Sequence, residues 1–248
     1  MSNRALVIPA AGRGRRLGAQ LPKLLVEVGG RSMAEHLLDL YREHVGRVVL
    51  VVSPESLVPV SKHIANRPEA ISLAVQHEPT GMLDAILLAT PFLREDPPEW
   101  VWITWSDQIA ILPQTAGALA ATCDGAGDTA MVVATIERSD PYIHFERDRD
   151  GRIRHILHAR EGDAMPERGE SDMGLFAVSA HAYFELLPRY ADEAAPGSAT
   201  EERNFLPFIG WLHGQAEVLT ISGHDPMESV GINTLEELAR VETFLDDG

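Results

Sequence analysis

Short apolar runs alternate with segments of helical periodicity along the first half of the chain, and this alternation restricts the possible folds more than any other feature. The apolar runs cover 4–10, 47–52, 71–75 and 100–105, and helices are expected over 32–44, 54–65, 81–93 and 113–123. Ser32 and Glu35 form a capping-box pattern at the start of the first helix. Continuous apolar runs are typical of buried parallel strands, and their alternation with helices favours a doubly wound sheet. We therefore expect an α/β fold, a three-layer Rossmann-like mostly parallel sheet flanked by helices.

The second half of the chain has a different pattern. Further strands are expected over 129–136, 172–178 and 217–221, a hairpin over 142–158, and helices over 202–213 and 234–245. Asp150 and Gly151 form a strong turn signal at the centre of the hairpin. The stretches 163–170 and 192–200 are rich in glycine, proline and acidic residues, so we expect exposed loops there. This half should therefore carry a small antiparallel β-hairpin subregion.

Charge and composition exclude several classes of partner. The chain of 248 residues has a formal net charge of −16, which argues against general binding to nucleic acid or to an anionic membrane. No apolar run approaches the roughly 20 residues that span a bilayer, and the arginines follow the first apolar stretch, the wrong order for a secretory signal. Cys123 is the single cysteine, so no intramolecular disulfide can form. We expect a soluble cytoplasmic protein.

One basic segment interrupts this acidic chain directly after the first expected strand. Residues 13–23 contain three arginines, no acidic residue, and one of the two lysines of the chain, Lys23. Glycines at 12 and 14 allow backbone N–H groups to approach phosphate oxygens, and arginine and lysine form charge-assisted hydrogen bonds to them. The glycine spacing fits neither the dinucleotide fingerprint nor a Walker loop. An ordinary turn with solvated arginines is the alternative, but Lys23 directly after Pro22 favours phosphate binding.

This segment, Gly12-Arg13-Gly14-Arg15-Arg16 followed by Pro22-Lys23, resembles the G-x-G-x-R-(x)n-P-K signature of the sugar-phosphate nucleotidyltransferase family. The likeness covers nearly the whole chain. Within the family, the chain is similar to the pyrophosphorylase domain of N-acetylglucosamine-1-phosphate uridyltransferase and to glucose-1-phosphate thymidylyltransferase. It implies that Arg16 binds the triphosphate and that Lys23 binds the phosphates at the reacting centre. Further nucleotide contacts implied by the resemblance are Ala10, Ala11, Gly12, Gly14 and Arg15.

The segment from Ala74 to Gly81 resembles the base-recognition segment of the thymidylyltransferases. The resemblance implies that Gln76 hydrogen-bonds a pyrimidine and that Gly81 lets the base lie against the backbone. A glutamine amide has one donor group and one acceptor group, and it can pair with a uracil or thymine edge. Cytosine is the second choice, because an amide can rotate. The structural alternative is that Gln76 is an exposed residue at the end of a strand.

Asp107 follows a buried strand, at the position where open α/β sheets bind their ligands. The resemblance implies that Asp107 is a Mg²⁺ ligand and a catalytic residue, that Ser106 replaces a family glycine beside the nucleotide, and that Asn233 is the second Mg²⁺ ligand. One carboxylate and one amide oxygen suit a Mg²⁺ ion that keeps most of its water. Each side chain has a structural alternative, because Asp107 could cap the next helix and Asn233 or Thr234 could cap the last one.

The residues expected to contact the sugar match the family less well. Tyr142, Arg160, Asp172 and Gly174 are the implied substrate contacts, but Ile143 follows Tyr142 where the family has glycine, and His158 replaces a glutamate. The histidines at 144, 155 and 158 do not have the spacing of a helical metal-binding pair, so we interpret them as surface or substrate contacts.

The resemblance implies a single domain over 1–248, with a nucleotide-binding half (1–125) and a half that binds sugar phosphate and carries the C-terminal helix (126–248). It implies a Mg²⁺-assisted enzyme that joins an NTP, with UTP or dTTP favoured, to a sugar-1-phosphate and releases pyrophosphate. Two alternatives stay open, a cytidylyltransferase for a non-sugar phosphate or phosphonate and an inactive nucleotide-sugar sensor. A homo-oligomer is also left open. Because no hexapeptide repeats follow the last helix, we expect no acetyltransferase activity.

Overall fold

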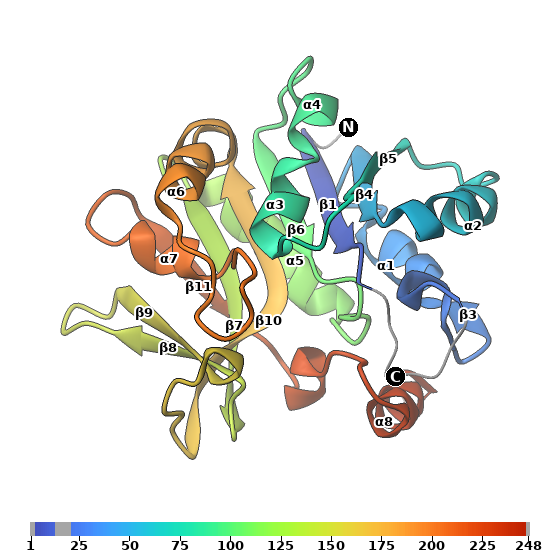
Figure 1. Cartoon of the computed structure of the whole chain (residues 1–248). Coiled ribbons are helices and arrows are strands. Elements are labelled where there is room, and N and C mark those ends of the chain that lie inside the picture. Colours follow the sequence, from blue (N-terminus) through green and yellow to red (C-terminus); the bar gives the residue numbers. More distant parts are fainter. Residues whose placement is uncertain (1–2, 13–20, 247–248) are drawn as a thin grey trace.

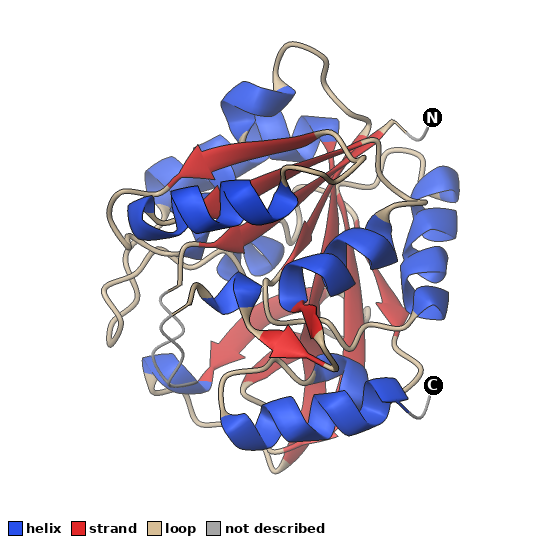
Figure 2. Ribbon diagram, turned by 90° about the vertical axis from the view of Figure 1, so that its right-hand side faces the viewer, coloured by secondary structure: helices blue, strands red, loops and turns tan. Residues whose placement is uncertain are grey.

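The computed structural model describes residues 3–12 and 21–246, and a seven-stranded sheet lies at its centre between two layers of helices (Figures 1 and 2). The strands follow the order β11-β7-β10-β6-β1-β4-β5. Their bounds are β1 Arg4–Ala10, β4 Arg47–Val52, β5 Ile71–Val75, β6 Trp100–Thr104, β7 Met131–Ser139, β10 Arg168–Ser179 and β11 Val218–Ser222. All neighbouring strands are parallel except β10, which is antiparallel to both β6 and β7. The expected three-layer, mostly parallel sheet is confirmed.

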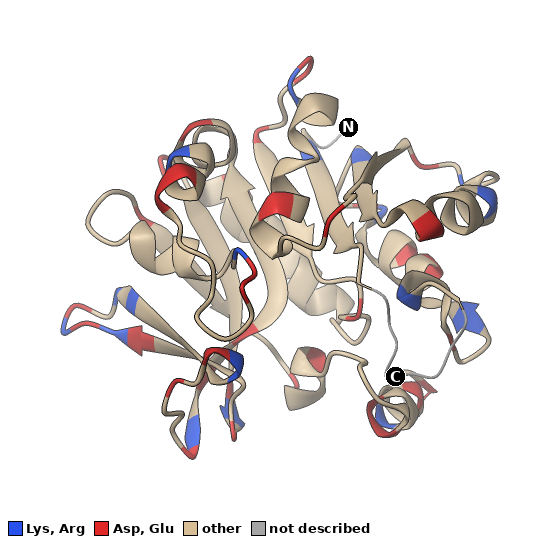
Figure 3. Cartoon of the chain, in the orientation of Figure 1, with Lys and Arg blue, Asp and Glu red and all other residues tan. Residues whose placement is uncertain are grey.

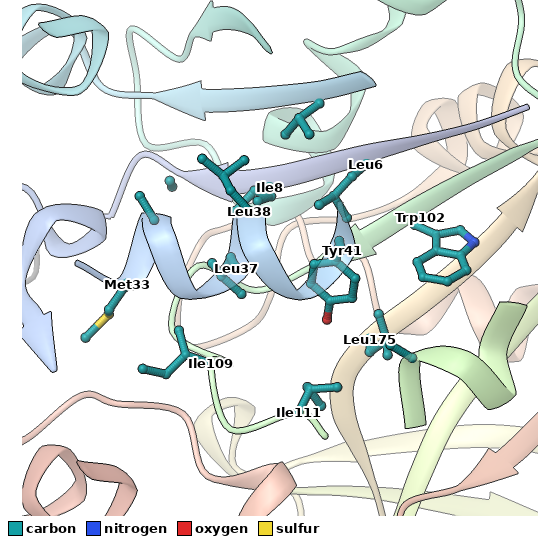
Figure 4. Close-up of a cluster of buried hydrophobic side chains, with 14 of the residues drawn as sticks. Leu6, Ile8, Met33, Leu37, Leu38, Tyr41, Trp102, Ile109, Ile111 and Leu175 are labelled. Atoms are coloured by element: carbon teal, nitrogen blue, oxygen red, sulfur yellow. The ribbon is translucent and has the colours of Figure 1, made fainter. Parts of the chain in front are cut away.

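Side chains of successive strand residues enter opposite hydrophobic layers. In β1, Leu6 and Ile8 pack on one face of the sheet, and Ala5 and Val7 pack on the other. Figure 4 shows Leu6 and Ile8 beside the side chains of the first helix, with Tyr41 close to Trp102. The helices on that face are α1 Met33–Tyr41, α2 Pro54–Ile64, α5 Pro113–Gly125 and α8 Leu235–Asp246. Those on the opposite face are α3 Met82–Leu87, α4 Thr90–Leu93, α6 Leu187–Glu193 and α7 Pro207–Trp211.

Local sequence signals account for the element boundaries. The capping box of α1 is present, with the Ser32 hydroxyl accepting from the Glu35 N–H, but the helix ends at Tyr41 instead of extending to residue 44. The helix expected over 81–93 divides into α3 and α4, because Pro91 cannot continue a helix from the preceding turn. The helix expected over 202–213 is confined to α7. Arg203, which precedes α7, forms no helical turn, because its N–H donates to the Thr80 carbonyl.

The segment between β10 and α7 contains helix that the sequence reading did not predict. A π-helical turn, η4 (Ala182–Leu186), leads directly into α6. Tyr183, Leu186, Leu187 and Tyr190 recur at helical spacing and are buried, so the signal was present despite Pro188. The loop expected over 163–170 was also too long, since β10 begins at Arg168.

The expected hairpin is present and lies beside the main sheet (Figure 1). Its strands, β8 Ile143–Arg147 and β9 Ile153–His158, are antiparallel, and Gly151 in the turn has a φ of 79°. A second short pair, β2 Glu27–Val28 and β3 Arg31–Ser32, lies near α8, where the Gly29 N–H donates to Glu242. Charged side chains are concentrated on the hairpin, helices and loops, and the central strands carry few (Figure 3).

Both halves of the chain contribute strands to the central sheet. β1, β4, β5 and β6 come from 1–125, and β7, β10 and β11 come from 126–248. This continuity supports the expected single domain, which stays a prediction. Within the described residues, no helix combines the length and the apolar character that crossing a membrane requires.

Candidate functional site

A cavity of about 390 Å³ opens beside the carboxyl ends of β1, β5 and β6. β1 pairs with β4 on one side and with β6 on the other, so the order of the sheet reverses there, and open α/β sheets bind ligands at such points. A second, adjoining cavity contains Lys23 and shares many lining residues with the first. We name two walls: the β1–β5 wall consists of Ala11, Gly12, Gln76 and Gly81, and the β7–β10 wall consists of Arg138, Tyr142, Arg160 and Asp172.

Three residues from distant parts of the chain meet between the two walls. Lys23 lies at the start of a short 3-10 helix, η2 (Lys23–Leu25), Asp107 follows β6, and Asn233 precedes α8. The Lys23 Nζ donates to Asp107 Oδ2 at 2.5 Å and to Asn233 Oδ1 at 2.8 Å. The Lys23 and Asp107 side chains are only 12% and 18% exposed, so the ion pair is largely shielded from water. The structure therefore brings together three of the predicted site residues.

Neither Asp107 nor Asn233 is occupied in capping a helix. The last helix is capped by Thr234, whose hydroxyl accepts from the Glu237 N–H at 3.2 Å, while the Glu237 carboxylate accepts from the N–H groups of Asn233 and Thr234. The residue at the N-cap of α5 is Leu112. Asn233 instead donates its Nδ2 to the Gly231 carbonyl, which directs its oxygen toward Lys23. Both side chains are thus available to a ligand.

The oxygens of Asp107 and Asn233 converge on one cationic atom, and carboxylate and amide oxygens are the hard ligands that Mg²⁺ prefers. Gly231 leaves room for the carboxylate, because a Cβ at this position would lie 3.3 Å from Asp107 Oδ1. The described residues contain no group of three or more histidine, cysteine or acidic side chains arranged to hold a metal. A divalent cation at this point would therefore take two protein oxygens and complete its shell from substrate and water.

The β1–β5 wall is built largely from backbone and small residues. Gln76 is 7% exposed, and its Nε2 donates to the Gly81 carbonyl at 3.0 Å, so it is not an exposed strand-end residue. Gly81 has a φ of 122°, and an added Cβ would lie 2.4 Å from the backbone nitrogen of Arg203. The glycine is thus required by the close approach of the Arg203 backbone. Ala11 and Gly12 line both cavities.

The β7–β10 wall contains three of the four residues expected to contact substrate. Tyr142, Arg160 and Asp172 line the cavity, and the Tyr142 ring packs against the edge of His158. Gly174 does not line it. This glycine has a φ of 68° and lies under Trp105, whose ring would be 2.4 Å from an added Cβ. Its N–H donates to Asp172 Oδ2 at 2.9 Å, so Gly174 positions the Asp172 carboxylate.

Burial changes the acid-base properties of this wall. Burial raises the pKa of Asp172 to about 6, against the opposing effects of the Gly174 N–H, Trp105 and Arg138. Burial also lowers the pKa of His158, which favours its neutral form. At neutral pH the wall therefore combines two guanidinium groups with a carboxylate whose ionised form is disfavoured by burial, and the neutral imidazole of His158 packs beside it.

The remaining residues that were predicted to bind the nucleotide fall into two groups. Some do not line a cavity, and the others lie outside the described residues. Ala10 is buried in the core, and Ser106 precedes Asp107 without lining either cavity. Gly14, Arg15 and Arg16 lie outside the described residues.

Several lining residues were missed by the sequence analysis. They are Trp105, Gln108, Arg138, Glu202, Asn204 and Phe205. Trp105 had a signal, since it directly follows a buried strand, whereas Glu202 and Asn204 lie on a segment that long-range contacts hold, among them those of Glu161. The Glu161 carboxylate accepts from the Thr200 hydroxyl at 2.6 Å and from the Asn204 amide at 3.1 Å. Gln108 Oε1 is buried with no hydrogen-bond partner in the described structure.

Comparisons with known proteins identify the family and the fold of the chain. A profile of the MobA-like NTP transferase domain matches residues 6–172. The bifunctional protein GlmU of Alcanivorax borkumensis is 27% identical over 96% of this chain and 51% of its own length, and that of Azorhizobium caulinodans is 30% identical over 99% and 54%. The chain thus spans about half the length of these curated relatives. A crystal structure from Bacillus anthracis, assigned as a glucose-1-phosphate thymidylyltransferase, superposes with a TM-score of 0.77 at 15% identity, covering 99% of this chain and 96% of that one.

Proposed function

Because this chain belongs to the MobA-like NTP transferase family, of the sugar-phosphate nucleotidyltransferase type, we propose that it joins a nucleoside triphosphate to a sugar-1-phosphate and releases pyrophosphate. The observation that carries this proposal is the meeting of Lys23, Asp107 and Asn233 at one point between the two walls. A lysine ammonium and two hard oxygens are the groups that a reaction between two anions needs at its centre.

The reaction requires positioning and charge neutralisation more than proton transfer. An oxygen of the acceptor phosphate forms a bond to the α-phosphorus, and the bond from that phosphorus to the bridging β-oxygen breaks, so pyrophosphate leaves with the electron pair. The second pKa of a phosphate monoester is about 6, so the nucleophile is already anionic at neutral pH and no general base is needed. Lys23 would hold the reacting phosphates, and Arg16, by its place in the family signature, would bind the triphosphate.

Asp107 and Asn233 would hold Mg²⁺, which supplies charge neutralisation at the α-phosphate when it is bound. The Lys23 ammonium donates to the same two side chains. Because one point cannot hold two cations, Lys23 would contact a phosphate where Asp107 and Asn233 hold the metal.

Gln76 supports UTP or dTTP as the nucleotide. Its amide nitrogen is bonded to the Gly81 carbonyl, which leaves the amide oxygen to accept from a base. The N3–H of uracil or thymine is such a donor. Cytosine stays the second choice because its amino group is also a donor.

A second candidate is a cytidylyltransferase for a small non-sugar phosphate or phosphonate. Ile143 stands where the family has glycine, and its side chain is buried in the core while it also lines the cavity. A side chain at this position shields the backbone N–H that the family glycine exposes to the sugar, which favours a different acceptor. An inactive sensor is less well supported, because it would not need Asp107 and Asn233 to converge.

The test is a matrix of the four NTPs and dTTP against glucose 1-phosphate, N-acetylglucosamine 1-phosphate, phosphocholine and 2-aminoethylphosphonate, with Mg²⁺ and pyrophosphate release as the readout. We expect release with UTP or dTTP and a sugar-1-phosphate. Release confined to CTP with phosphocholine or the phosphonate would establish the second candidate. Nucleotide binding that is independent of Mg²⁺, with no release in any combination, would establish the sensor. If the Asp107→Ala and Asn233→Ala variants released pyrophosphate at the wild-type rate, the roles assigned to these two residues would be contradicted.

A further inference from the structure

Arg138 differs from the other partly buried arginines of the described chain. The others, Arg4, Arg47, Arg67 and Arg203, pair with the carboxylates of Asp124, Asp96, Asp39 and Asp84 respectively. Within the described residues Arg138 has no carboxylate partner at ion-pairing distance, and its Nη1 donates a long hydrogen bond of 3.4 Å to the Ser229 carbonyl. Among residues 3–12 and 21–246 the guanidinium thus lines the cleft with no carboxylate at ion-pairing distance, and the carboxyl of Asp172 interacts with it only from farther away.

An unpaired guanidinium in this position is costly to the protein. A guanidinium is always charged in proteins, and burying part of it removes hydration that one long hydrogen bond to the Ser229 carbonyl replaces only in part. Acidic residues are not scarce, since the chain has 37 of them, and four similar arginines have found one. This contrast indicates that the partner of Arg138 is an anionic ligand.

The place of Arg138 in the sheet indicates which ligand it meets. β7, which carries Arg138, lies three positions from β1 and five from β5, or roughly 14 and 24 Å at about 4.8 Å per strand. The β1–β5 wall is therefore distant from its backbone. The bond to Ser229 places the guanidinium beside the segment that leads to Asn233, and Arg138 lines both cavities. Its charge also acts on Asp172, whose pKa it lowers against the effect of burial.

We propose that Arg138 binds the phosphate or phosphonate group of the acceptor substrate and holds it next to the centre formed by Lys23, Asp107 and Asn233. The planar guanidinium can donate two parallel hydrogen bonds to such a group, which fixes its orientation as well as its position. Arg138 is then a specificity-determining residue for the acceptor and has no part in nucleotide binding. This inference rests on the proposed function in one respect, that the acceptor carries a phosphoryl group.

The test measures binding and not turnover. The protein is saturated with α,β-imido UTP and Mg²⁺, which cannot release pyrophosphate, and is titrated in a calorimeter with glucose 1-phosphate and, separately, with inorganic phosphate. Arg138→Gln is compared with Arg138→Lys and with the control Arg168→Gln, whose side chain is 74% exposed and lies 3.7 Å from Glu137. Thermal unfolding checks that each variant is folded.

We expect Arg138→Gln to weaken both phosphate probes at least tenfold and to change the affinity for the UTP analogue less than twofold. Arg138→Lys should lose about threefold, because the charge remains and the paired geometry is lost, and it serves as the test if Arg138→Gln does not fold. Unchanged binding of both probes, or no binding by the wild type, would overturn the proposal. So would a loss confined to glucose 1-phosphate, which would indicate contact with the sugar, or an equal loss for the UTP analogue.

Failure of this inference is distinguishable from failure of the proposed function. If the substrate matrix releases no pyrophosphate but phosphate binding still depends on Arg138, the anion site stands and the enzymatic assignment fails. If pyrophosphate is released and Arg138→Gln binds both phosphate probes normally, the enzymatic assignment stands and the role of Arg138 fails.

Discussion

The β1–β5 wall and the β7–β10 wall face the same cleft but are built differently. Ala11, Gly12 and Gly81 of the first wall act through backbone and small size, and each follows closely on a strand. The second wall acts through charged and aromatic side chains, including Arg138 and Asp172, that come from separate strands. Local backbone conformation is enough to form the first wall, whereas the second exists only when distant strands are in register.

This difference predicts where variation within such a fold would occur. Where backbone segments approach closely, as at Gly81, the wall tolerates few changes, because an added Cβ meets the chain itself. A wall made from side chains can change its ligand by substitution without altering the fold. We therefore expect nucleotide binding to depend on the β1–β5 wall and acceptor choice to depend on the β7–β10 wall.

The largest effect is expected at the centre that both walls share. Lys23→Ala should reduce pyrophosphate release about 10²- to 10³-fold, the usual loss when one group that stabilises charge in the transition state is removed. The measurement is the steady-state rate with the best substrate pair from the matrix. Lys62→Ala is the matched control, because Lys62 is the other lysine of the chain and lies exposed on α2. Equal losses in the two variants would show that Lys23 has no special role.

The next effect tests whether the β1–β5 wall depends on backbone. Gly81→Ala should lower the free energy of unfolding by about 3 kcal/mol or more, since the new Cβ would meet the Arg203 backbone at 2.4 Å and φ is 122°. Gly117→Ala is the control, because Gly117 lies within α5 with no atom within 4 Å of an added Cβ. That control should gain up to about 1 kcal/mol from helix propensity. Denaturant unfolding measures both, and a Gly81→Ala variant as stable as its control would refute the backbone argument.

The smallest effect concerns Asp172 and depends on pH. The pKa of Asp172 in the folded state, about 6, lies above the ordinary value of 3.8, so the protonated form favours the folded state. This contribution to stability is complete below pH 3.8 and is lost as pH rises through about 6. Asp172→Asn removes the ionisation and can still accept from the Gly174 N–H. The variant should therefore gain at most about 3 kcal/mol relative to wild type at pH 8 and little near pH 4.

Unfolding of wild type and variant at several pH values between 4 and 8 tests the Asp172 prediction. Asp192→Asn is the control, because Asp192 is exposed at the end of α6. A stability difference between Asp172→Asn and wild type that does not change with pH would show that burial does not perturb this carboxyl group. Such a result would also remove one of the features that distinguish the β7–β10 wall.

Much of the fold was predictable because its signals are local. The bounds of β1, β4 and β5 are those expected from apolar runs, and the capping box of α1 lies within four consecutive residues. The missed helix α6 also had helical spacing, but Pro188 at its start obscured the pattern. The predicted start of the helix over 202–213 was wrong, because the Arg203 N–H donates to the Thr80 carbonyl and not to a carbonyl of a helical turn.

The candidate site was predictable where its residues belong to short motifs. Lys23, Asp107 and Asn233 were each named from the sequence by resemblance to a family, but their sequence positions do not reveal that one ammonium group contacts both oxygens. Arg138 was not found, because its significance is the absence of an acidic partner within the described structure, and no local pattern encodes that.

The sequence by itself determined the alternation of strands and helices, the basic glycine-containing segment and the family resemblance, because each depends on residues within one turn, strand or loop. Only the tertiary structure decided that β10 runs against its neighbours and that Thr234 and not Asn233 caps the last helix. It alone also shows that, in the described part of the chain, Arg138 has no carboxylate at ion-pairing distance. These features depend on which distant segments become neighbours. The order and register of the sheet determine that choice through the packing of the whole core.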